Sequence, residues 1–149
     1  MNYFSVWGNS LTGSIPSEIG ASANMTYFAL SSNSLSSTIP SELGRFENAT
    51  SFYIQRNYLT GEIPTELANL TKIEAFRFEN NYLSGTVPAA ICALVTFGDL
   101  QVVASDCTER VECACCDVCC PTLFGETEAS GPSLVIDASE IVCREDEFF

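Results

Sequence analysis

The chain has 149 residues, 46% of them hydrophobic and 17% charged, a composition that suits one folded domain and excludes wholesale disorder. It carries 19 acidic and 6 basic side chains and no histidine, so its net charge is −13. Without histidine there is no Ser-His-Asp or Cys-His catalytic pair and no histidine-ligated zinc, and so few cations argue against nucleic-acid binding.

The amino-terminal residues give no sign of a membrane segment or a signal peptide. No apolar run in the chain reaches the ~20 residues that cross a bilayer. Met1 is followed by Asn2, Tyr3 and Phe4, without the basic start and apolar stretch of a signal peptide. We therefore expect no membrane span in this chain. Because it begins within a repeat, we also expect it to be a carboxyl-terminal fragment, with more repeats and a signal upstream.

Residues 1–91 contain four copies of a 24-residue repeat. Each copy has an asparagine, a leucine two residues later, and a proline seven residues after the asparagine. These columns are Asn9, Asn33, Asn57 and Asn81; Leu11, Leu35, Leu59 and Leu83; and Pro16, Pro40, Pro64 and Pro88. A fixed period of this length with regular apolar spacing predicts a solenoid whose apolar columns form one continuous core.

Each repeat also predicts one short strand. Apolar residues alternate with variable ones upstream of each asparagine, as in Phe28 and Leu30 or Phe52 and Ile54, and this alternation is typical of a strand. The strands would stack into a parallel sheet. The stacked asparagines would then satisfy backbone groups at the turns, and each proline would start a second piece on the outer surface.

The segment from Ile73 to Pro88 fits the pattern Leu-x-x-Leu-x-Leu-x-x-Asn-x-Leu-x-Gly-x-Ile-Pro, and residues 1–91 thereby resemble plant-type leucine-rich repeat proteins. The chain departs from the pattern where phenylalanine replaces leucine, at Ala49, and at Ser37 in place of glycine. The resemblance implies an α/β solenoid with short parallel strands on its concave face and loops or 3-10 turns on its convex face. It also implies recognition of proteins, peptides or glycans.

Side chains that alternate with the core residues would face the concave side. Those that suit ligand binding are aromatic, amide or cationic, because such residues are enriched in binding hot spots. They are Tyr3, Trp7, Tyr27, Tyr53, Gln55 and Arg77. In the alternative interpretation, the aromatic residues stiffen the sheet through cross-strand pairs, or Trp7 contacts a neighbouring repeat outside the chain. The asparagine columns are expected to be structural.

All eight cysteines lie after residue 91, where the acidic residues also concentrate. They are Cys92, Cys107, Cys113, Cys115, Cys116, Cys119, Cys120 and Cys143. The even count favours four disulfides, although 105 pairings are possible, and adjacent cysteines should bond to different partners. A bridge from Cys92 to Cys107 would close about 15 residues and contribute on the order of 3 kcal/mol. The alternatives are a thiolate zinc site using Cys113, Cys116 and Cys119 or a similar set, and free thiols.

We expect three segments: four repeats over residues 1–91, a cysteine-rich cap over 92–120, and an acidic tail over 121–149 that is partly ordered at most. The cysteine-rich segment resembles the tails that follow leucine-rich repeats in predicted proteins of diatoms and related algae. That resemblance implies a cap on the last repeat.

Three asparagines lie in Asn-x-Ser/Thr triplets and are candidate glycosylation sites: Asn24, Asn48 and Asn69. Together with the cysteines they favour the secretory route, and hence a secreted or cell-surface protein.

The sequence therefore predicts a non-catalytic, extracellular binding module that needs no cofactor or metal. Its partner would be a protein, peptide or glycan. Nineteen carboxylates could supply a glycosidase-like pair, but none occupies a column that would place two across a pocket. Two alternatives remain open. One is an inhibitor of a secreted hydrolase, because the plant-type repeats that these resemble also occur in inhibitors of cell-wall hydrolases. The other is a fragment of a receptor ectodomain.

Overall fold

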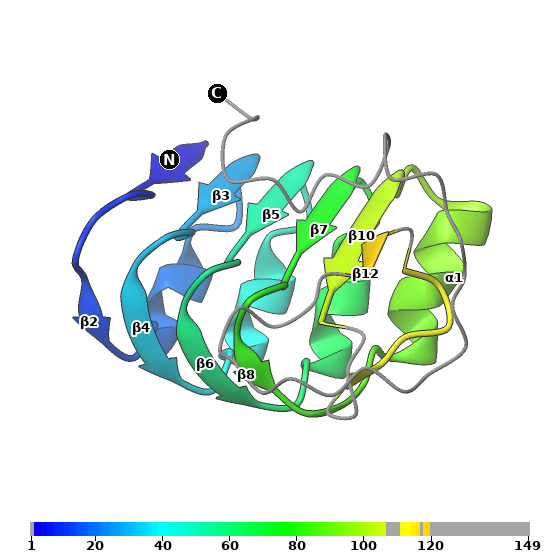
Figure 1. The fold of residues 1–149 in the computed structure, drawn as a ribbon. Coiled ribbons are helices and arrows are strands. Elements are labelled where there is room, and N and C mark those ends of the chain that lie inside the picture. The colour runs from blue at the N-terminus through cyan, green and yellow to red at the C-terminus, as the bar shows by residue number, and fades with distance from the viewer. Residues whose placement is uncertain (1, 107–110, 117, 120–149) are drawn as a thin grey trace, which may run out of the picture.

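The structure is a computed structural model that describes residues 2–106, 111–116 and 118–119. The chain winds into stacked coils, with a parallel six-stranded sheet along one surface and short helices along the opposite one (Figure 1). The predicted solenoid is therefore confirmed. We call the outer surface of the large sheet the concave face. Its strands in spatial order are β1 (Tyr3–Ser5), β3 (Tyr27–Ala29), β5 (Ser51–Tyr53), β7 (Ala75–Arg77), β10 (Val102–Ser105) and β12 (Val118–Cys119).

The first four strands pair in the register that the repeat predicts. Tyr3 lies opposite Tyr27, which lies opposite Ser51, and Ser51 lies opposite Ala75, so each step equals one repeat. The middle residue of each strand points into the core, because successive side chains of a strand point to opposite faces. The phenylalanines at this position in β3, β5 and β7 are fully buried: Phe28, Phe52 and Phe76.

After each of the first four strands of the large sheet the chain turns through a second short strand. These second strands form a parallel sheet of β2 (Thr12–Gly13), β4 (Ser34–Ser37), β6 (Tyr58–Gly61) and β8 (Tyr82–Leu83). A separate pair joins β9 (Gly85–Thr86) to β11 (Val111–Glu112). The turn into the outer surface passes through the left-handed region in every repeat. Three repeats use glycine there, but the second uses Ser37, with a φ of +73°.

Each of the first three repeats then forms a 3-10 helix directly after its proline. The helices are η1 (Ser17–Ala21), η2 (Ser41–Arg45) and η3 (Thr65–Asn69). The preceding prolines have extended backbones and cap the helices, a position that needs no backbone N–H. The helices pack closely, because a Cβ added to Gly44 would clash with the carbonyl oxygen of Glu66.

The asparagine columns join neighbouring coils, as the sequence predicts. The Asn57 amide nitrogen donates to the carbonyls of Leu30 and Ile54 at 3.0 and 3.1 Å, while its oxygen accepts from the Leu35 N–H at 3.0 Å. Asn33 and Asn81 make the same set of bonds. At the amino-terminal end, Asn9 is exposed and bonds only to carbonyls of its own coil. The columns therefore satisfy backbone groups that the turns would leave unpaired.

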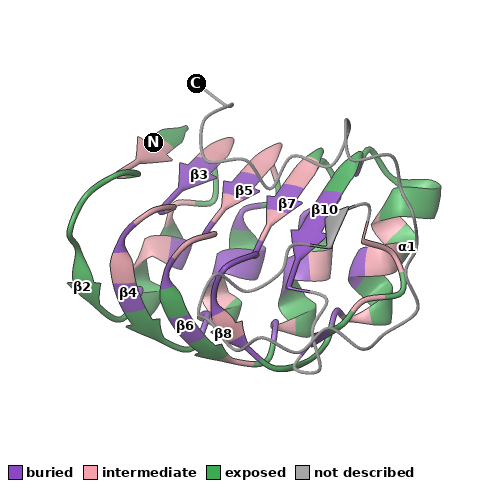
Figure 2. Ribbon diagram, viewed as in Figure 1, coloured by how far each residue is buried: buried purple, intermediate pink, exposed green. Residues whose placement is uncertain are grey.

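The first coil departs from the predicted continuous core. Leu11 is 43% exposed, although its counterparts Leu35, Leu59 and Leu83 are buried. Phe4 and Val6 are only partly buried, and the first coil is more exposed than the central ones in Figure 2. The physical reason is position: among the described residues, no coil lies on the outer side of β1 and β2.

The chain adds a further coil that the 24-residue period does not reveal. The helix α1 (Ala89–Phe97) takes the place of a 3-10 helix, and β10 then pairs with β7. Val102 lies opposite Ala75, so this coil is longer than the others by three residues. Val103 fills the core position of Phe76 and is fully buried. The expected segment boundary at residue 92 falls inside α1, and the acidic tail lies outside the described residues.

Asp106 ends the ladder of backbone hydrogen bonds between coils. In earlier coils, backbone carbonyls of the next coil accept these bonds, as when Glu79 and Asn80 accept from the Arg56 and Asn57 N–H groups. At the last step the Asp106 carboxylate accepts instead, from the N–H groups of Asn80 and Asn81 at 2.7 and 3.0 Å. A side chain thus replaces two backbone acceptors, which lets the chain leave the stack without orphaned donors.

Candidate functional site

Three tyrosines form a row across the first strands of the concave face. The rings of Tyr3 and Tyr27 are stacked, with centroids 4.5 Å apart and planes 6° apart. Tyr53 meets Tyr27 edge-on at 5.5 Å. Tyr3 is 59% exposed, and the other two are partly exposed. The row has the geometry of cross-strand pairs and still offers an aromatic surface to a ligand, so both sequence interpretations are compatible with it.

The Tyr27 hydroxyl stays protonated at physiological pH. Burial raises the pKa of Tyr27 above its ordinary value, and the neighbouring Tyr3 and Tyr53 raise it further. The Tyr27 hydroxyl therefore remains a hydrogen-bond donor as well as an acceptor at physiological pH.

Trp7 and Gln55 follow the strands at corresponding positions in the first and third coils. Trp7 is 51% exposed at the amino-terminal edge of the sheet. Gln55 is partly buried in the middle of the sheet, and its side-chain oxygen Oε1 is buried without a hydrogen-bond partner. Gln55 thus retains acceptor capacity that no group of the described fold uses.

Arg77 differs from the free cation that a binding hot spot suggests, because it is paired within the chain. Its Nε donates to Oε1 of Glu79 at 2.8 Å, and the guanidinium and carboxylate form an ion pair. Arg77 is partly buried and Glu79 is only 1% exposed. Burial raises the pKa of the Glu79 carboxyl; Arg77 opposes this, and nearby Asp106 adds to it. The second oxygen of Glu79, Oε2, is buried without a partner.

Neither Glu79 nor Asp106 is among the ligand-binding residues predicted from the sequence, although the strand alternation does place Glu79 on the concave side. Asp106 is 3% exposed, and burial raises its pKa although two backbone N–H groups oppose the shift. In the sequence, Glu79 is the one charged residue at its repeat position, where the other three repeats have tryptophan, serine and glutamine. No repeat column points to Asp106, because the last coil has a different length.

The candidate ligand-binding residues lie along one sheet, but they do not all contact one another. The ring of Tyr27 contacts those of Tyr3 and Tyr53, and Tyr53 lies opposite Arg77 in the strand register. Trp7 lies at one edge, whereas Arg77 and Glu79 lie three strands away. The surface therefore runs from an aromatic end at β1 to an acidic, polar end at β7 and β10.

Two disulfides lie among the described cysteines. Cys92 in α1 pairs with Cys115, and Cys113 pairs with Cys116. The adjacent Cys115 and Cys116 thus have different partners, as predicted, and the illustrative bridge from Cys92 to Cys107 is wrong. The zinc alternative fails for Cys113 and Cys116, because each sulfur is bonded to the other. Cys107, Cys120 and Cys143 lie outside the described residues, and so does the side chain of Cys119.

The three candidate glycosylation sites lie away from the large sheet. Asn24 and Asn48 are in turns before β3 and β5, and Asn69 ends η3. Asn24 and Asn69 are exposed, whereas Asn48 is partly buried and accepts a hydrogen bond from Lys72 Nζ at 2.7 Å. A glycan has an open approach at Asn24 and Asn69.

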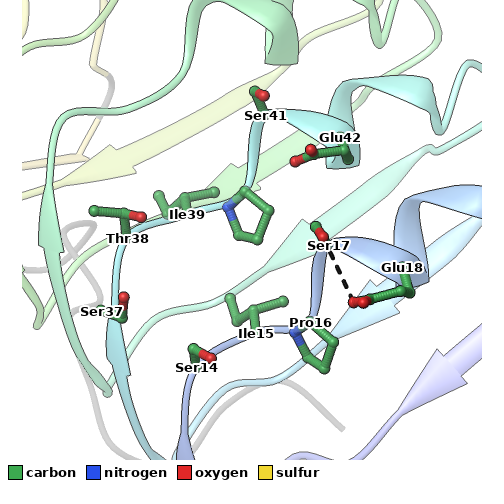
Figure 3. Close-up of a pocket in the computed structure, with 11 residues that line it drawn as sticks. Ser14, Ile15, Pro16, Ser17, Glu18, Ser37, Thr38, Ile39, Ser41 and Glu42 are labelled. Atoms are coloured by element: carbon green, nitrogen blue, oxygen red, sulfur yellow. Dashed lines mark hydrogen bonds between the residues drawn. The ribbon is translucent and has the colours of Figure 1, made fainter.

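A groove of about 680 Å³ lies on the other side of the molecule, between the first two coils (Figure 3). Equivalent segments of two successive repeats line the groove, residues 14–18 and 37–42. Each segment contributes an isoleucine and a proline, together with hydroxyl groups and one glutamate carboxylate, that of Glu18 or Glu42. Its lining contains no aromatic ring and no cation. The groove is therefore a space left between two stacked coils. Among the described residues, no cluster of three or more acidic, histidine or cysteine side chains could hold a metal ion.

Comparison with known proteins identifies the fold. The family model described as Leucine Rich Repeat matches residues 24–46 and 48–70, which cover the second and third repeats. The fold is thus a leucine-rich repeat solenoid with parallel strands and 3-10 turns. Among curated proteins, no significant match was found.

Many solved structures resemble this chain, and several are plant receptors. The structure titled as a TDR receptor is 33% identical over 70% of this chain, with a TM-score of 0.65. The plant peptide hormone receptor RGFR1 in complex with RGF2 is 33% identical over 74% of this chain, with a TM-score of 0.69. The PEPR1–AtPEP1 complex is 35% identical over 62%, with a TM-score of 0.61. The chain spans only 18%, 17% and 13% of these structures, respectively.

Proposed function

We propose that the chain is a non-catalytic binding module that recognises a peptide or protein ligand through its concave face. The observation that carries the proposal is the partly exposed row of Tyr3, Tyr27 and Tyr53, because surface tyrosines dominate many binding hot spots. The resemblance to a peptide hormone receptor in complex with RGF2 supports a peptide in particular. A glycan stacked on the same rings is the remaining ligand class.

We further propose that the module is secreted or displayed at the cell surface. The two disulfides support an oxidising compartment, and the receptor structures support a place among ligand-binding ectodomains. Among the described residues, no helix has both the length and the apolar content needed to span a bilayer. Of the alternatives from sequence, the similarity to plant receptors favours part of a receptor ectodomain over a hydrolase inhibitor.

The test is a paired alanine substitution in the tyrosine row. The protein is first screened against peptide and glycan arrays, and the affinity of its best ligand is then measured. The double variant Tyr27→Ala with Tyr53→Ala should lose at least about tenfold in affinity, because two aromatic anchors are removed. The matched control is Tyr58→Ala with Tyr82→Ala, a stacked pair on the second sheet with centroids 6.0 Å apart. Unchanged affinity in the first variant, or an equal loss in the control, contradicts the proposal.

A further inference from the structure

Three acceptor residues, Gln55, Glu79 and Asp106, occupy equivalent positions of neighbouring coils at the acidic end of the concave face. Gln55 and Glu79 occupy the same repeat position after β5 and β7. The register of β10 with β7 places Ala104 opposite Arg77, so Asp106 follows opposite Glu79. Backbone bonds keep the Gln55 and Glu79 coils adjacent beyond the strands, since Arg56 N–H donates to the Glu79 carbonyl at 3.0 Å.

Hydrogen bonding in this cluster is incomplete. Glu79 Oε1 accepts from Arg77, and both Asp106 oxygens accept from backbone N–H groups. Gln55 Oε1 and Glu79 Oε2 have no partner, although both are buried. A buried acceptor without a donor costs about 1–3 kcal/mol, and more when it is charged. Residues at the same position of two neighbouring coils thus each have a buried oxygen without a hydrogen-bond donor.

The charge of the cluster is also unbalanced. Among the described residues, Arg77 forms an ion pair with Glu79, and the carboxylate of Asp106 lies near enough to Glu79 to raise its pKa. Burial raises the pKa of both carboxyl groups, and Asp106 raises that of Glu79. A cation bound beside Glu79 would offset this destabilisation.

We propose that Gln55, Glu79 and Asp106 form a subsite for a primary ammonium group of the ligand, a lysine side chain or a peptide amino terminus. The inference rests on the proposed function of the concave face and adds the chemistry of one ligand group. An ammonium carries three donors on a compact centre, which suits the two unpaired oxygens. A guanidinium is larger and planar, and Arg77 already occupies that role. No hydrogen bond has to be broken at the Gln55 oxygen before it accepts one from the ligand.

The subsite lies within reach of a ligand on the tyrosine row. Tyr27 and Glu79 are two strands and four residues apart in register, which corresponds to roughly 16 Å at ordinary sheet spacings. About five residues of extended peptide span that distance. A ligand that uses both ends of the surface therefore carries an aromatic or apolar residue and a lysine about five positions apart.

The experiment compares two capped peptides by isothermal titration calorimetry with the full chain. The probe is acetyl-Trp-Gly-Gly-Gly-Gly-Lys-amide, and its control carries acetyl-lysine, which keeps the length but removes the charge. The lysine peptide should bind at least tenfold more tightly, as expected for a charge-assisted hydrogen bond. Equal binding, or no binding of the lysine peptide, overturns the subsite.

Variants separate the subsite from the concave face as a whole. Glu79→Gln should abolish the tenfold preference while leaving the binding of the acetyl-lysine peptide unchanged. If Glu79→Gln unfolds, Gln55→Leu replaces it and should reduce the preference by severalfold. Tyr27→Ala with Tyr53→Ala should weaken both peptides equally. Loss of binding in the tyrosine variant with an unchanged preference in Glu79→Gln rejects the subsite and retains the proposed function. The opposite pattern rejects the tyrosine row.

Discussion

At the scale of single residues, backbone conformation explains one departure from the repeat pattern. Ser37 stands where other repeats have glycine, yet its φ of +73° keeps the same left-handed turn. A residue with a Cβ pays about 1–2 kcal/mol in this region. The fold therefore imposes the turn on an unfavourable residue, and the sequence shows the departure but not its cost.

We expect Ser37→Gly to stabilise the protein by about 0.5–1 kcal/mol, the relief of this strain less the greater chain entropy of unfolded glycine. The measurement is the free energy of unfolding in urea. Ser36→Gly is the matched control, because the neighbouring serine lies outside the left-handed region and should lose stability. A loss of stability in Ser37→Gly would show that the hydroxymethyl group contributes packing that outweighs the strain.

The two buried carboxylates make stability depend on pH. The pKa values of Glu79 and Asp106 are raised in the folded state, so folding favours their protonated forms. Their contribution is greatest below the unfolded pKa of about 4, and it is lost as pH rises through the folded values. We expect the free energy of unfolding to increase between pH 7.5 and pH 5. Glu79→Gln should reduce this slope, whereas the exposed Glu66→Gln should leave it intact.

At the scale of elements, the asparagine columns connect one coil to the next. Asn57 satisfies buried backbone groups of its own coil and of the preceding one, whereas Asn9 bonds only locally and is exposed. The same residue type at the same repeat position therefore contributes differently along the stack. The repeat period identifies the asparagine column, whereas the position of each asparagine in the stack decides how much it contributes to the free energy of unfolding.

Asn57→Ala should destabilise the protein by about 3 kcal/mol or more, because it leaves several buried backbone groups unpaired. Asn9→Ala should cost less than about 1 kcal/mol, since water replaces its bonds. Thermal or urea unfolding of the two variants measures the difference. Similar losses in both would mean that the column acts mainly through turn propensity and not through coil-to-coil bonds.

At the scale of the whole molecule, the carboxyl-terminal segment is fastened to the solenoid in three ways. The Asp106 carboxylate ends the backbone ladder, β11 pairs with β9, and Cys115 is bonded to Cys92 in α1. Val111 is also buried in the main core. Residues 111–116 are thus held against the solenoid by backbone pairing and apolar contact as well as by the Cys92–Cys115 bond.

The two disulfides should differ in their effect on stability. The Cys92–Cys115 bond spans 23 residues, and its loss in the double alanine variant should cost about 3 kcal/mol in the chain-entropy account. The Cys113–Cys116 bond spans 3 residues, and its loss should cost about half as much. Urea unfolding of the two double variants measures both effects. Equal losses would show that contacts around the sulfur atoms, and not chain entropy, set the contribution.

The sequence predicts the solenoid, the strand register of the first four repeats and the role of the asparagine columns. It could do so because a strict period forces equivalent residues into equivalent positions in neighbouring coils. It also placed the tyrosines on the outer face of the sheet, since alternation along a strand fixes the side that each residue takes. Tertiary structure alone decided the further coil of α1 and β10, the pairing of Cys92 with Cys115, and the burial of Glu79 beside Arg77 and Asp106. These features depend on contacts between segments that break the period, where spacing along the chain no longer specifies which groups meet in space.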